Sequence, residues 1–307
     1  MKTQYFIFTI FFVILCVSQL PIFSETKSQG ASPQFIWPIR TANLERKLSS
    51  VFGESRRDHF HNGLDISSVN EAVLAMESGM VLYSHYKEDD PYQDDMGPGN
   101  SVWLYHGAGY LSAYYHLGNR RVDRIKTKLQ VAKGDKIAIT GNTGHSGGAH
   151  LHFLVAAQFG KEIVNPIKTL PPVVDSKPPR IGALVLQVDN SFTYINDGDN
   201  INISRAFPLS VTVNDAGEQP GQRRGIYRIR FTYNGKILKE SRFGYISLEN
   251  GEWKNEDGLR FSELFHENRY FLGELDLQAG NHTIRVDAAD YNGNSATKTF
   301  HFHVNRI

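Results

Sequence analysis

Residues 144–153, with the sequence GHSGGAHLHF, decide how the rest of the chain is interpreted. A glycine-rich turn leads here into a strand-like segment. Because side chains alternate between the two faces of a strand, His150 and His152 project from one face, roughly 6–7 Å apart along the backbone. Leu151 and Phe153 then point the other way, into a core. Two histidines so placed can share one small site, but an ordinary polar strand face has the same pattern, so other parts of the sequence have to decide.

The composition restricts the class of protein. The chain has 307 residues, which is long enough for two domains with sizeable cores. Its formal net charge of +1 gives no electrostatic case for a nucleic-acid partner or for an anionic membrane surface. The 14 Tyr and 19 Phe residues, together with frequent Gly, favour a β-rich structure.

The N-terminus predicts export. Lys2 precedes an almost wholly apolar run, so we expect residues 1–24 to be a signal peptide. The alternative is a retained anchor, because the run is close to the ~20 residues that a helix needs to span a bilayer, and membrane association is expected only in that case. Cys16, the single cysteine, follows Leu15, which disfavours lipidation. The mature protein would then be periplasmic, associated with the cell envelope or secreted, without a disulfide.

Four further segments follow. Residues 25–48 form an N-terminal lead-in. Residues 49–168 contain short strand-like runs separated by turns and no long helical pattern, which predicts an all-β, antiparallel sheet or barrel-like domain. Prolines cluster in residues 169–180, which we interpret as a linker. Evenly spaced strand-like runs over residues 181–307 predict a β-sandwich of immunoglobulin-like type.

Some local elements can be predicted more closely. Residues 72–75 and 79–83 are expected to be two strands around a turn. Asn234-Gly235 is a strong signal for a tight hairpin turn, since both residues tolerate positive φ angles. Residues 261–268 are expected to include a short helix.

A second constellation lies at residues 61–65, with the sequence HNGLD. In a regular strand His61 and Asp65 would be about 13 Å apart, too far to bind one ion. Gly63 suits a tight bend, which would let the imidazole and the carboxylate converge. With His152 they make three ligands of types that zinc accepts, and three protein ligands leave the fourth position open, as in catalytic zinc sites. A hard cation would need more carboxylate oxygens.

Three motifs now stand in order: HNGLD at residues 61–65, YYHL at residues 114–117 and HLH at residues 150–152. Together with Gly-rich framework segments, they make residues 50–165 resemble the lysostaphin/LytM-type zinc metallopeptidases. The resemblance implies the duplicated hybrid motif fold of that family. It also implies one zinc ion per chain, held by three residues: His61, Asp65 and His152.

Two further histidines match family positions that do not bind the metal. His116, in the YYHL motif, and His150 would assist catalysis. One of them would accept the proton of the attacking water, and the other would donate to the oxyanion of the substrate. Which histidine has which role is left open.

The resemblance implies an exported zinc-dependent endopeptidase that hydrolyses peptide bonds in the stem or cross-bridge of peptidoglycan by metal-activated water. Peptidoglycan peptides are therefore the expected partners. The alternative is a non-hydrolytic LytM-type activator or wall-binding protein that regulates another cell-wall hydrolase. Such relatives typically lack some of the site residues, whereas all five positions are filled here. A wall-binding role for the C-terminal domain and the oligomeric state are left open.

Other motifs receive less weight. His301 and His303 repeat the His-x-His pattern near the C-terminus, but they have no glycine turn before them and no companion motif, so we interpret them as an ordinary strand face. His59 is expected to support the site or to lie on the surface, and His145 could line the groove. Four arginines are interpreted as a solvated face: Arg223, Arg224, Arg228 and Arg230.

Overall fold

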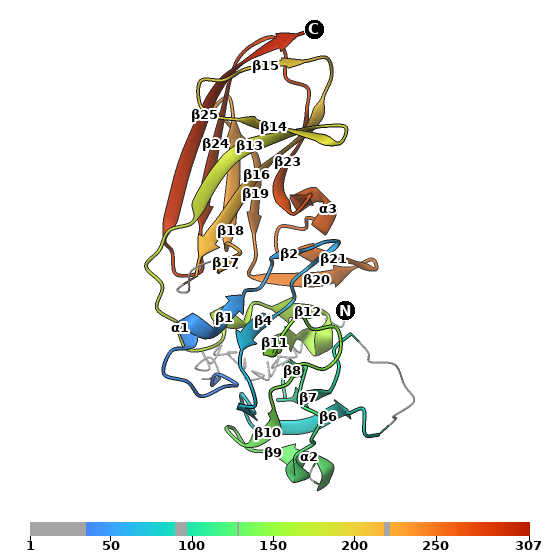
Figure 1. The fold of residues 1–307 in the computed structure, drawn as a ribbon. Coiled ribbons are helices and arrows are strands. Elements are labelled where there is room, and N and C mark those ends of the chain that lie inside the picture. The colour runs from blue at the N-terminus through green and yellow to red at the C-terminus, as the bar shows by residue number, and fades with distance from the viewer. Residues whose placement is uncertain (1–34, 90–96, 128, 218–221) are drawn as a thin grey trace, which may run out of the picture. The chain divides into compact units, whose positions relative to one another are not determined.

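The computed structural model describes residues 35–89, 97–127, 129–217 and 222–307 (Figure 1). The predicted signal peptide, the alternative membrane anchor and Cys16 lie outside these residues. Within the described ranges, no helix is both long and apolar enough to cross a membrane. Residues Gln34–Ile307 form one structural unit, which contains both predicted domains.

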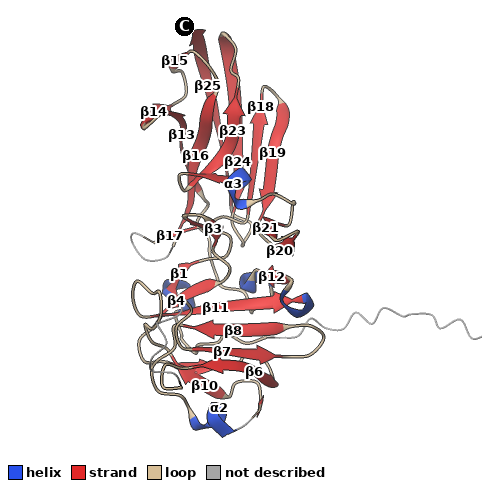
Figure 2. Cartoon of the chain, turned by 90° about the vertical axis from the view of Figure 1, so that its right-hand side faces the viewer, coloured by secondary structure: helices blue, strands red, loops and turns tan. Residues whose placement is uncertain are grey.

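The described chain is almost entirely β-structure, which confirms the predicted all-β class (Figure 2). Its helices are short: α1 (Leu44–Lys47), α2 (Asp123–Thr127), α3 (Phe261–Leu264) and the 3-10 turns η1 (Gln158–Gly160) and η2 (Pro166–Lys168). The α3 turn lies where the sequence predicted a short helix.

One ten-stranded antiparallel sheet carries the residues of the three motifs. Along the sheet the order is β21-β20-β12-β11-β8-β7-β6-β9, with β4 paired to β11 and β1 to β4. The strands are β1 (Leu48–Ser50), β4 (Leu64–Ser67), β6 (Gly79–His85), β7 (Ser101–Tyr105), β8 (Leu111–Tyr115), β9 (Gln130–Val131), β11 (His150–Ala157), β12 (Glu162–Val164), β20 (Tyr245–Glu249) and β21 (Glu252–Asn255). Two small antiparallel pairs flank it: β2 (Ser55–Arg56) with β3 (His59–Phe60), and β5 (Ala72–Leu74) with β10 (Lys136–Ile139).

The two strands expected around residues 76–78 form, but they do not pair with each other. β5 pairs with β10, whereas β6 pairs with β7 and β9. The reason lies in the connecting backbone: the N–H of Ala75 donates to the carbonyl of Asp135 at 2.9 Å, and that of Met76 to the Tyr114 hydroxyl at 2.9 Å. These tertiary hydrogen bonds direct the chain away from a hairpin.

The second half of the chain forms the predicted β-sandwich. Its first sheet has the order β14-β13-β16-β23-β22, with β17 paired to β16, and its second sheet has the order β15-β25-β24-β18-β19. The strands are β13 (Arg180–Val188), β14 (Ser191–Ile195), β15 (Asn200–Ile203), β16 (Phe207–Ala216), β17 (Arg223–Arg224), β18 (Arg228–Tyr233), β19 (Lys236–Arg242), β22 (Phe265–His266), β23 (Arg269–Leu275), β24 (Gly280–Ala289) and β25 (Ser295–Arg306). Most pairs are antiparallel, while β15 and β25 run parallel.

Local turn chemistry follows the sequence. Asn234 and Gly235 have φ angles of 45° and 81° and connect β18 to β19, as predicted for a tight hairpin turn. Residues 171–179 have no regular secondary structure, as expected for a proline-rich segment. The boundaries assigned to the domains stay a prediction.

The β20–β21 hairpin joins the two halves of the chain. It follows the predicted linker in sequence, yet β20 pairs with β12, with Ile246 opposite Ile163.

The two faces of β11 contribute to different hydrophobic cores. Leu151 and Phe153 are buried beneath the ten-stranded sheet, as expected, whereas Leu154 on the other face shares a cluster with Ile246 and the sandwich core. The face that carries His152 is therefore partly covered by the second half of the chain.

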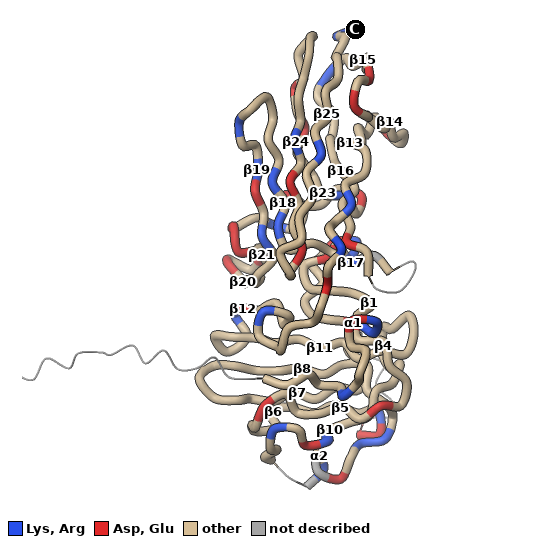
Figure 3. The backbone as a smooth tube through the Cα atoms, turned by 90° about the vertical axis from the view of Figure 1, so that its left-hand side faces the viewer, with Lys and Arg blue, Asp and Glu red and all other residues tan. Residues whose placement is uncertain are grey.

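The interpretation of the four arginines as a solvated face is wrong for Arg224. Lys, Arg, Asp and Glu positions lie on the neighbouring strands β18, β19 and β24 (Figure 3), and Arg228 and Arg230 both pair with Glu240 at the surface. Arg224, however, is buried, with 5% of its side chain exposed. It faces the carboxylate of Asp175 and the backbone of residues 45–48 instead of solvent, because these acceptors satisfy its donors inside the protein.

Candidate metal centre

Strand pairing brings the three motifs together. In the antiparallel pair β4–β11, Asp65 lies directly opposite His152, and in the pair β8–β11, Tyr115 lies opposite His152 on the other side. Directly opposed residues share a face of the sheet, so Asp65 and His152 point to the same side. His116 follows β8 at once and therefore reaches the same region.

The predicted zinc ligands converge on one point. The Nε2 atom of His61 lies 3.1 Å from Oδ1 of Asp65 and 3.2 Å from Nδ1 of His152, and the last two atoms are 2.9 Å apart. Two ligands bound tetrahedrally at about 2.0–2.1 Å from zinc would be roughly 3.3 Å apart. The donor types and their spacing therefore fit zinc.

Hydrogen bonds on the far side of each imidazole select the atom that faces this point. The Nδ1–H of His61 donates to the carbonyl of Val51 at 2.7 Å, which leaves Nε2 as the free lone pair. The Nε2–H of His152 donates to Oδ1 of Asn62 at 3.0 Å, which leaves Nδ1. Such outer partners are typical of metal-binding histidines, since they fix the tautomer and the ring orientation.

Gly63 permits the close approach of these groups. The chain bends at this residue, as the sequence predicted. A Cβ atom here would lie 2.7 Å from Nε2 of His152 and 2.5 Å from the carbonyl oxygen of Phe153. Glycine is therefore required for space and not for an unusual φ angle.

The electrostatics keep the ligands in their metal-binding forms. Burial by itself would raise the pKa of Asp65, but the close approach of the His152 and His61 rings outweighs it and holds this pKa well below its usual range. Burial lowers the pKa of His152 to about 4, so its imidazole is neutral at pH 7. The ring of His152 also stacks on Tyr115, with centroids 5.4 Å apart.

The second carboxylate oxygen of Asp65 has charged partners as well. Its Oδ2 atom lies 3.5 Å from the Arg56 guanidinium, which also donates to Oε2 of Glu54 at 3.0 Å. Oε1 of Glu54 accepts the backbone N–H of Gly225 at 2.9 Å, a residue from the second half of the chain. Sequence reasoning missed Asn62, Arg56 and Glu54. Asn62 could have been suspected from its place inside the HNGLD motif, whereas Glu54 becomes visible only through the tertiary contact.

The two other predicted site histidines lie beside the ligands. Nδ1–H of His116 donates to the carbonyl of Thr143 at 2.8 Å, and Nδ1–H of His150 donates to the carbonyl of Gly148 at 2.7 Å. Both rings thus keep Nε2 as an acceptor, and their centroids are 4.8 Å apart. Nε2 of His150 lies 3.6 Å from Oδ1 of Asp65.

The backbone and the burial of His116 are unusual. Its φ angle is +57°, in a region that costs non-glycine residues energy and is often found at functional sites. Burial lowers its pKa below the usual value. The structure thus places two imidazoles with free Nε2 atoms next to a potential zinc site.

The remaining histidines lie elsewhere. His59 is exposed and bonds Asp58, and His145 is exposed in the glycine turn. His301 lies on an exposed strand face and pairs with Asp197 at 2.8 Å. Among the described residues, neither His301 nor His303 belongs to a group of three possible metal ligands.

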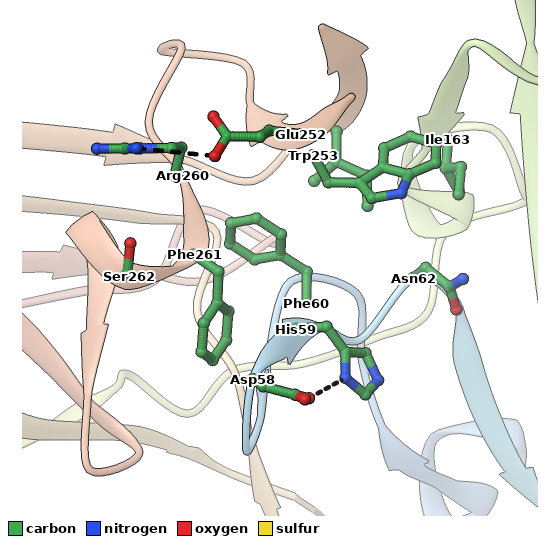
Figure 4. Close-up of a pocket in the computed structure, with 11 residues that line it drawn as sticks. Asp58, His59, Phe60, Asn62, Ile163, Glu252, Trp253, Arg260, Phe261 and Ser262 are labelled. Carbon is green, nitrogen blue, oxygen red and sulfur yellow. Dashed lines mark hydrogen bonds and ion pairs between the residues drawn. The ribbon is translucent and has the colours of Figure 1, made fainter. Parts of the chain in front are cut away.

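A cavity of about 520 Å³ adjoins the centre at Asn62 (Figure 4). Phe60 and His59 form one side, and α3 and the β20–β21 hairpin form the other, with Phe261 and Trp253 facing the space. Asn62 thus lines the cavity and also holds His152 in place.

Comparison with known proteins identifies this arrangement. Residues 59–166 match peptidase family M23, and the range contains all five predicted site residues. A second family, which has no functional description, matches residues 178–305. The chain is similar to the peptidoglycan DD-endopeptidase ShyA of Vibrio cholerae, with 31% identity over 143 residues that cover 46% of this chain and 30% of ShyA.

Two further proteins that resemble this chain have different functional names. The murein hydrolase activator NlpD of Escherichia coli is 32% identical over 136 residues, covering 44% of this chain and 31% of NlpD. A zinc-containing peptidase of Vibrio cholerae with a solved structure is 29% identical, with coverage of 46% and 41% and a TM-score of 0.36. The chain thus spans about a third of the length of the two curated relatives, ShyA and NlpD. Residues 59–166 of this chain are therefore similar to peptidase family M23.

Proposed function

We propose that the chain is an exported zinc-dependent endopeptidase that hydrolyses peptide bonds in peptidoglycan. One observation carries the proposal: three ligands of zinc type and two further histidines, each anchored through Nδ1, lie within one small region. Similarity to a DD-endopeptidase over 143 residues supports it. The cell-wall relatives also support location outside the cytoplasm.

His61, Asp65 and His152 would hold the metal, each through the atom that its other hydrogen bonds leave free. Zinc bound there would supply a Lewis acid for the scissile carbonyl and lower the pKa of a coordinated water. The chain itself contributes a carboxylate that stays ionised and, at His152, an imidazole that is neutral at pH 7.

His116 and His150 would handle the protons. A neutral Nε2 atom can accept a proton from the attacking water and later deliver it to the amine that leaves. A protonated or correctly oriented second imidazole can donate to the developing oxyanion of the substrate. Both rings are anchored at Nδ1 by a backbone carbonyl, so each can act only through Nε2.

The cavity beside Asn62 would bind the part of the peptidoglycan peptide that extends from the scissile bond. Its walls are aromatic and apolar, and its rim carries an ion pair between Arg260 and Glu252 at 3.7 Å. Such a combination suits a peptide with both apolar and charged groups. The hairpin from the second half of the chain would then contribute directly to substrate binding.

The alternative is an activator that does not hydrolyse the wall itself, which the similarity to NlpD supports. One experiment distinguishes an endopeptidase from an activator. Purified sacculi are incubated with the zinc-loaded full chain alone, with the His116→Ala variant, and with each protein plus a separate cell-wall amidase. An endopeptidase releases fragments on its own and forms new peptide termini that mass spectrometry detects. An activator only increases the products of the amidase, and His116→Ala would then retain that effect.

A further inference from the structure

Three carboxylates meet at a second place in the fold, away from the histidine centre. Asp175 belongs to the irregular segment before β13, Asp215 to β16, and Asp290 follows β24. One oxygen from each lies within 4.8 Å of the others. Asp215 and Asp290 are each 3% exposed, and 7% of the Asp175 side chain is exposed.

One of these carboxylates is less well hydrogen-bonded than the other two. Asp290 accepts the backbone N–H groups of Asn292 and Asn294 at 2.8 and 2.9 Å and the side-chain amide of Asn294 at 2.7 Å, and Asp175 accepts the backbone N–H of Lys177 at 2.9 Å. Oδ1 of Asp215, in contrast, is buried without a hydrogen-bond partner among the described residues. Burying a carboxylate oxygen in this way is unfavourable unless a cation or a donor compensates it.

Among the described residues, Arg224 is a buried cation beside the three carboxylates, with its guanidinium 3.6 Å from Oδ2 of Asp175. It is shared with two backbone carbonyls, those of Glu45 and Leu48. If all three acids are ionised, the group keeps an excess of negative charge in a place of low exposure.

The carboxylates also line a small cavity of about 20 Å³. A space of ~10–15 Å³ is enough for a single water molecule. The cavity therefore has room for one small ion. Asp215, whose oxygen lacks a partner, is among the lining residues.

We propose that Asp175, Asp215 and Asp290 bind one divalent cation of the calcium class. All three donors are carboxylate oxygens, which hard cations prefer, whereas zinc prefers sites with nitrogen or sulfur ligands. Each carboxylate can bind through one or both oxygens, and water can complete the 6–8 oxygen ligands that calcium takes. This site therefore differs in chemistry from the histidine centre.

The bound cation would fasten the segment at Asp175 to the ends of β16 and β24. The loop after β24 already holds that segment, because the side-chain amide of Asn294 donates to the carbonyl of Asp175 at 3.0 Å and that of Asn292 to Val173 at 2.6 Å. A cation would add links that depend on its concentration. The predicted consequence is stabilisation of the folded chain by calcium.

A proton is the competing occupant. Burial, with a contribution from the carboxylates of Asp175 and Asp290, raises the pKa of Asp215 to about 7. Without a cation, Asp215 would therefore hold a proton near neutral pH. In that case added calcium would neither bind here nor stabilise the chain.

Calorimetry and thermal unfolding distinguish a site that binds calcium from a site that holds only a proton. The zinc-loaded full chain is freed of calcium and titrated with calcium chloride, and its Tm is measured with and without the ion. We expect one calcium per chain and a rise in Tm. The variants Asp215→Asn and Asp175→Asn should lose both effects, while Asp215→Asn without calcium should be about as stable as the parent, because the uncharged amide replaces a carboxyl group that holds a proton in the absence of calcium.

Two control variants locate the effect. Asp189→Asn removes a carboxylate whose side chain is 80% exposed, and should keep calcium binding. His152→Ala alters the histidine centre and should also keep it. Absence of a binding heat and of a Tm shift in the parent, unchanged binding in both Asp215→Asn and Asp175→Asn, or loss of binding in His152→Ala would each overturn the proposal.

Discussion

Asp65 and His152 lie directly opposite each other on β4 and β11, with Oδ1 and Nδ1 only 2.9 Å apart. This cross-strand pair connects two motifs that are 87 residues apart in the sequence. Because the pairing register fixes which side chains share a face, a slip of one residue would turn one of the two groups away. The proposed metal centre therefore depends directly on the strand register.

Gly63→Ala tests how tightly this centre is built. The added methyl would lie 2.7 Å from Nε2 of His152 and 2.5 Å from backbone, so the bend must shift. Overpacking of this kind costs about 1–3 kcal/mol of unfolding free energy. We expect a lower Tm and weaker zinc binding, measured by thermal unfolding and by competition with a chelator. Gly147→Ala, where a Cβ meets no atom within 4 Å, is the control and should match the parent. Equal zinc affinity in both variants would contradict the close packing.

Asn62→Ala removes the acceptor that orients His152. Loss of such an outer hydrogen bond typically weakens metal binding by about 10–100-fold. Zinc affinity measured by competition with a chromogenic chelator should fall in this range. Asn281→Ala breaks a comparable Asn–His contact, to His303 at 2.7 Å on the sandwich, and should leave the affinity unchanged. If Asn62→Ala binds zinc like the parent, the orienting role assigned to Asn62 is wrong.

The pH dependence of activity should reflect the depressed pKa of His116. Burial lowers this pKa below 6.5, so the folded protein takes up the proton only at a lower pH than the unfolded chain does. A base must be neutral to act, and kcat/KM should therefore stay constant from neutral pH down to about 6.5 and fall below it. The exposed-histidine variant His301→Gln should show the same profile. An acidic limb that already begins above pH 7 would be inconsistent with His116 as the base.

Trp253→Ala tests the cavity as a substrate site. Trp253 lies on β21, faces the cavity and is 36% exposed. Removing about 1–2 kcal/mol of substrate binding would raise KM by roughly 5–30-fold and leave kcat and zinc content unchanged. Tyr194→Ala, which truncates a 59% exposed aromatic residue on β14, serves as the matched control. Identical KM values for the two variants would remove the cavity from the binding site.

The sequence predicts the site better than its surroundings. Short motifs name His61, Asp65, His116, His150 and His152, because metal chemistry restricts the residue types and strand periodicity fixes which ones share a face. The bend at Gly63 could be predicted as well, since a straight strand would separate His61 from Asp65 by about 13 Å.

Contacts between distant segments could not be predicted in this way. The pairing of β20 with β12 depends on where the second half of the chain folds, and nothing in the local pattern of residues 245–249 indicates that partner. The support of Asp65 by Glu54 and Gly225 is of the same kind. Arg224 is a further example: an arginine is usually exposed, and only tertiary acceptors explain its burial.

The acidic cluster formed by Asp175, Asp215 and Asp290 is the clearest example of a feature that the sequence could not predict. Asp175, Asp215 and Asp290 come from three separate segments and form no motif with a fixed spacing. A strand ending in Asp is common in β-proteins and says nothing by itself about a cation. Only the fold shows that the three carboxylates meet in one buried place.

Zinc content of three purified proteins, determined by elemental analysis, tests the central claim most directly. We expect close to one zinc per chain in the parent and in His116→Ala, and none in His152→Ala, because His152 is one of the three proposed ligands and His116 is not. Activity on sacculi, followed in the same samples, should be lost in both variants. Full zinc occupancy in His152→Ala would contradict the assignment of the metal centre.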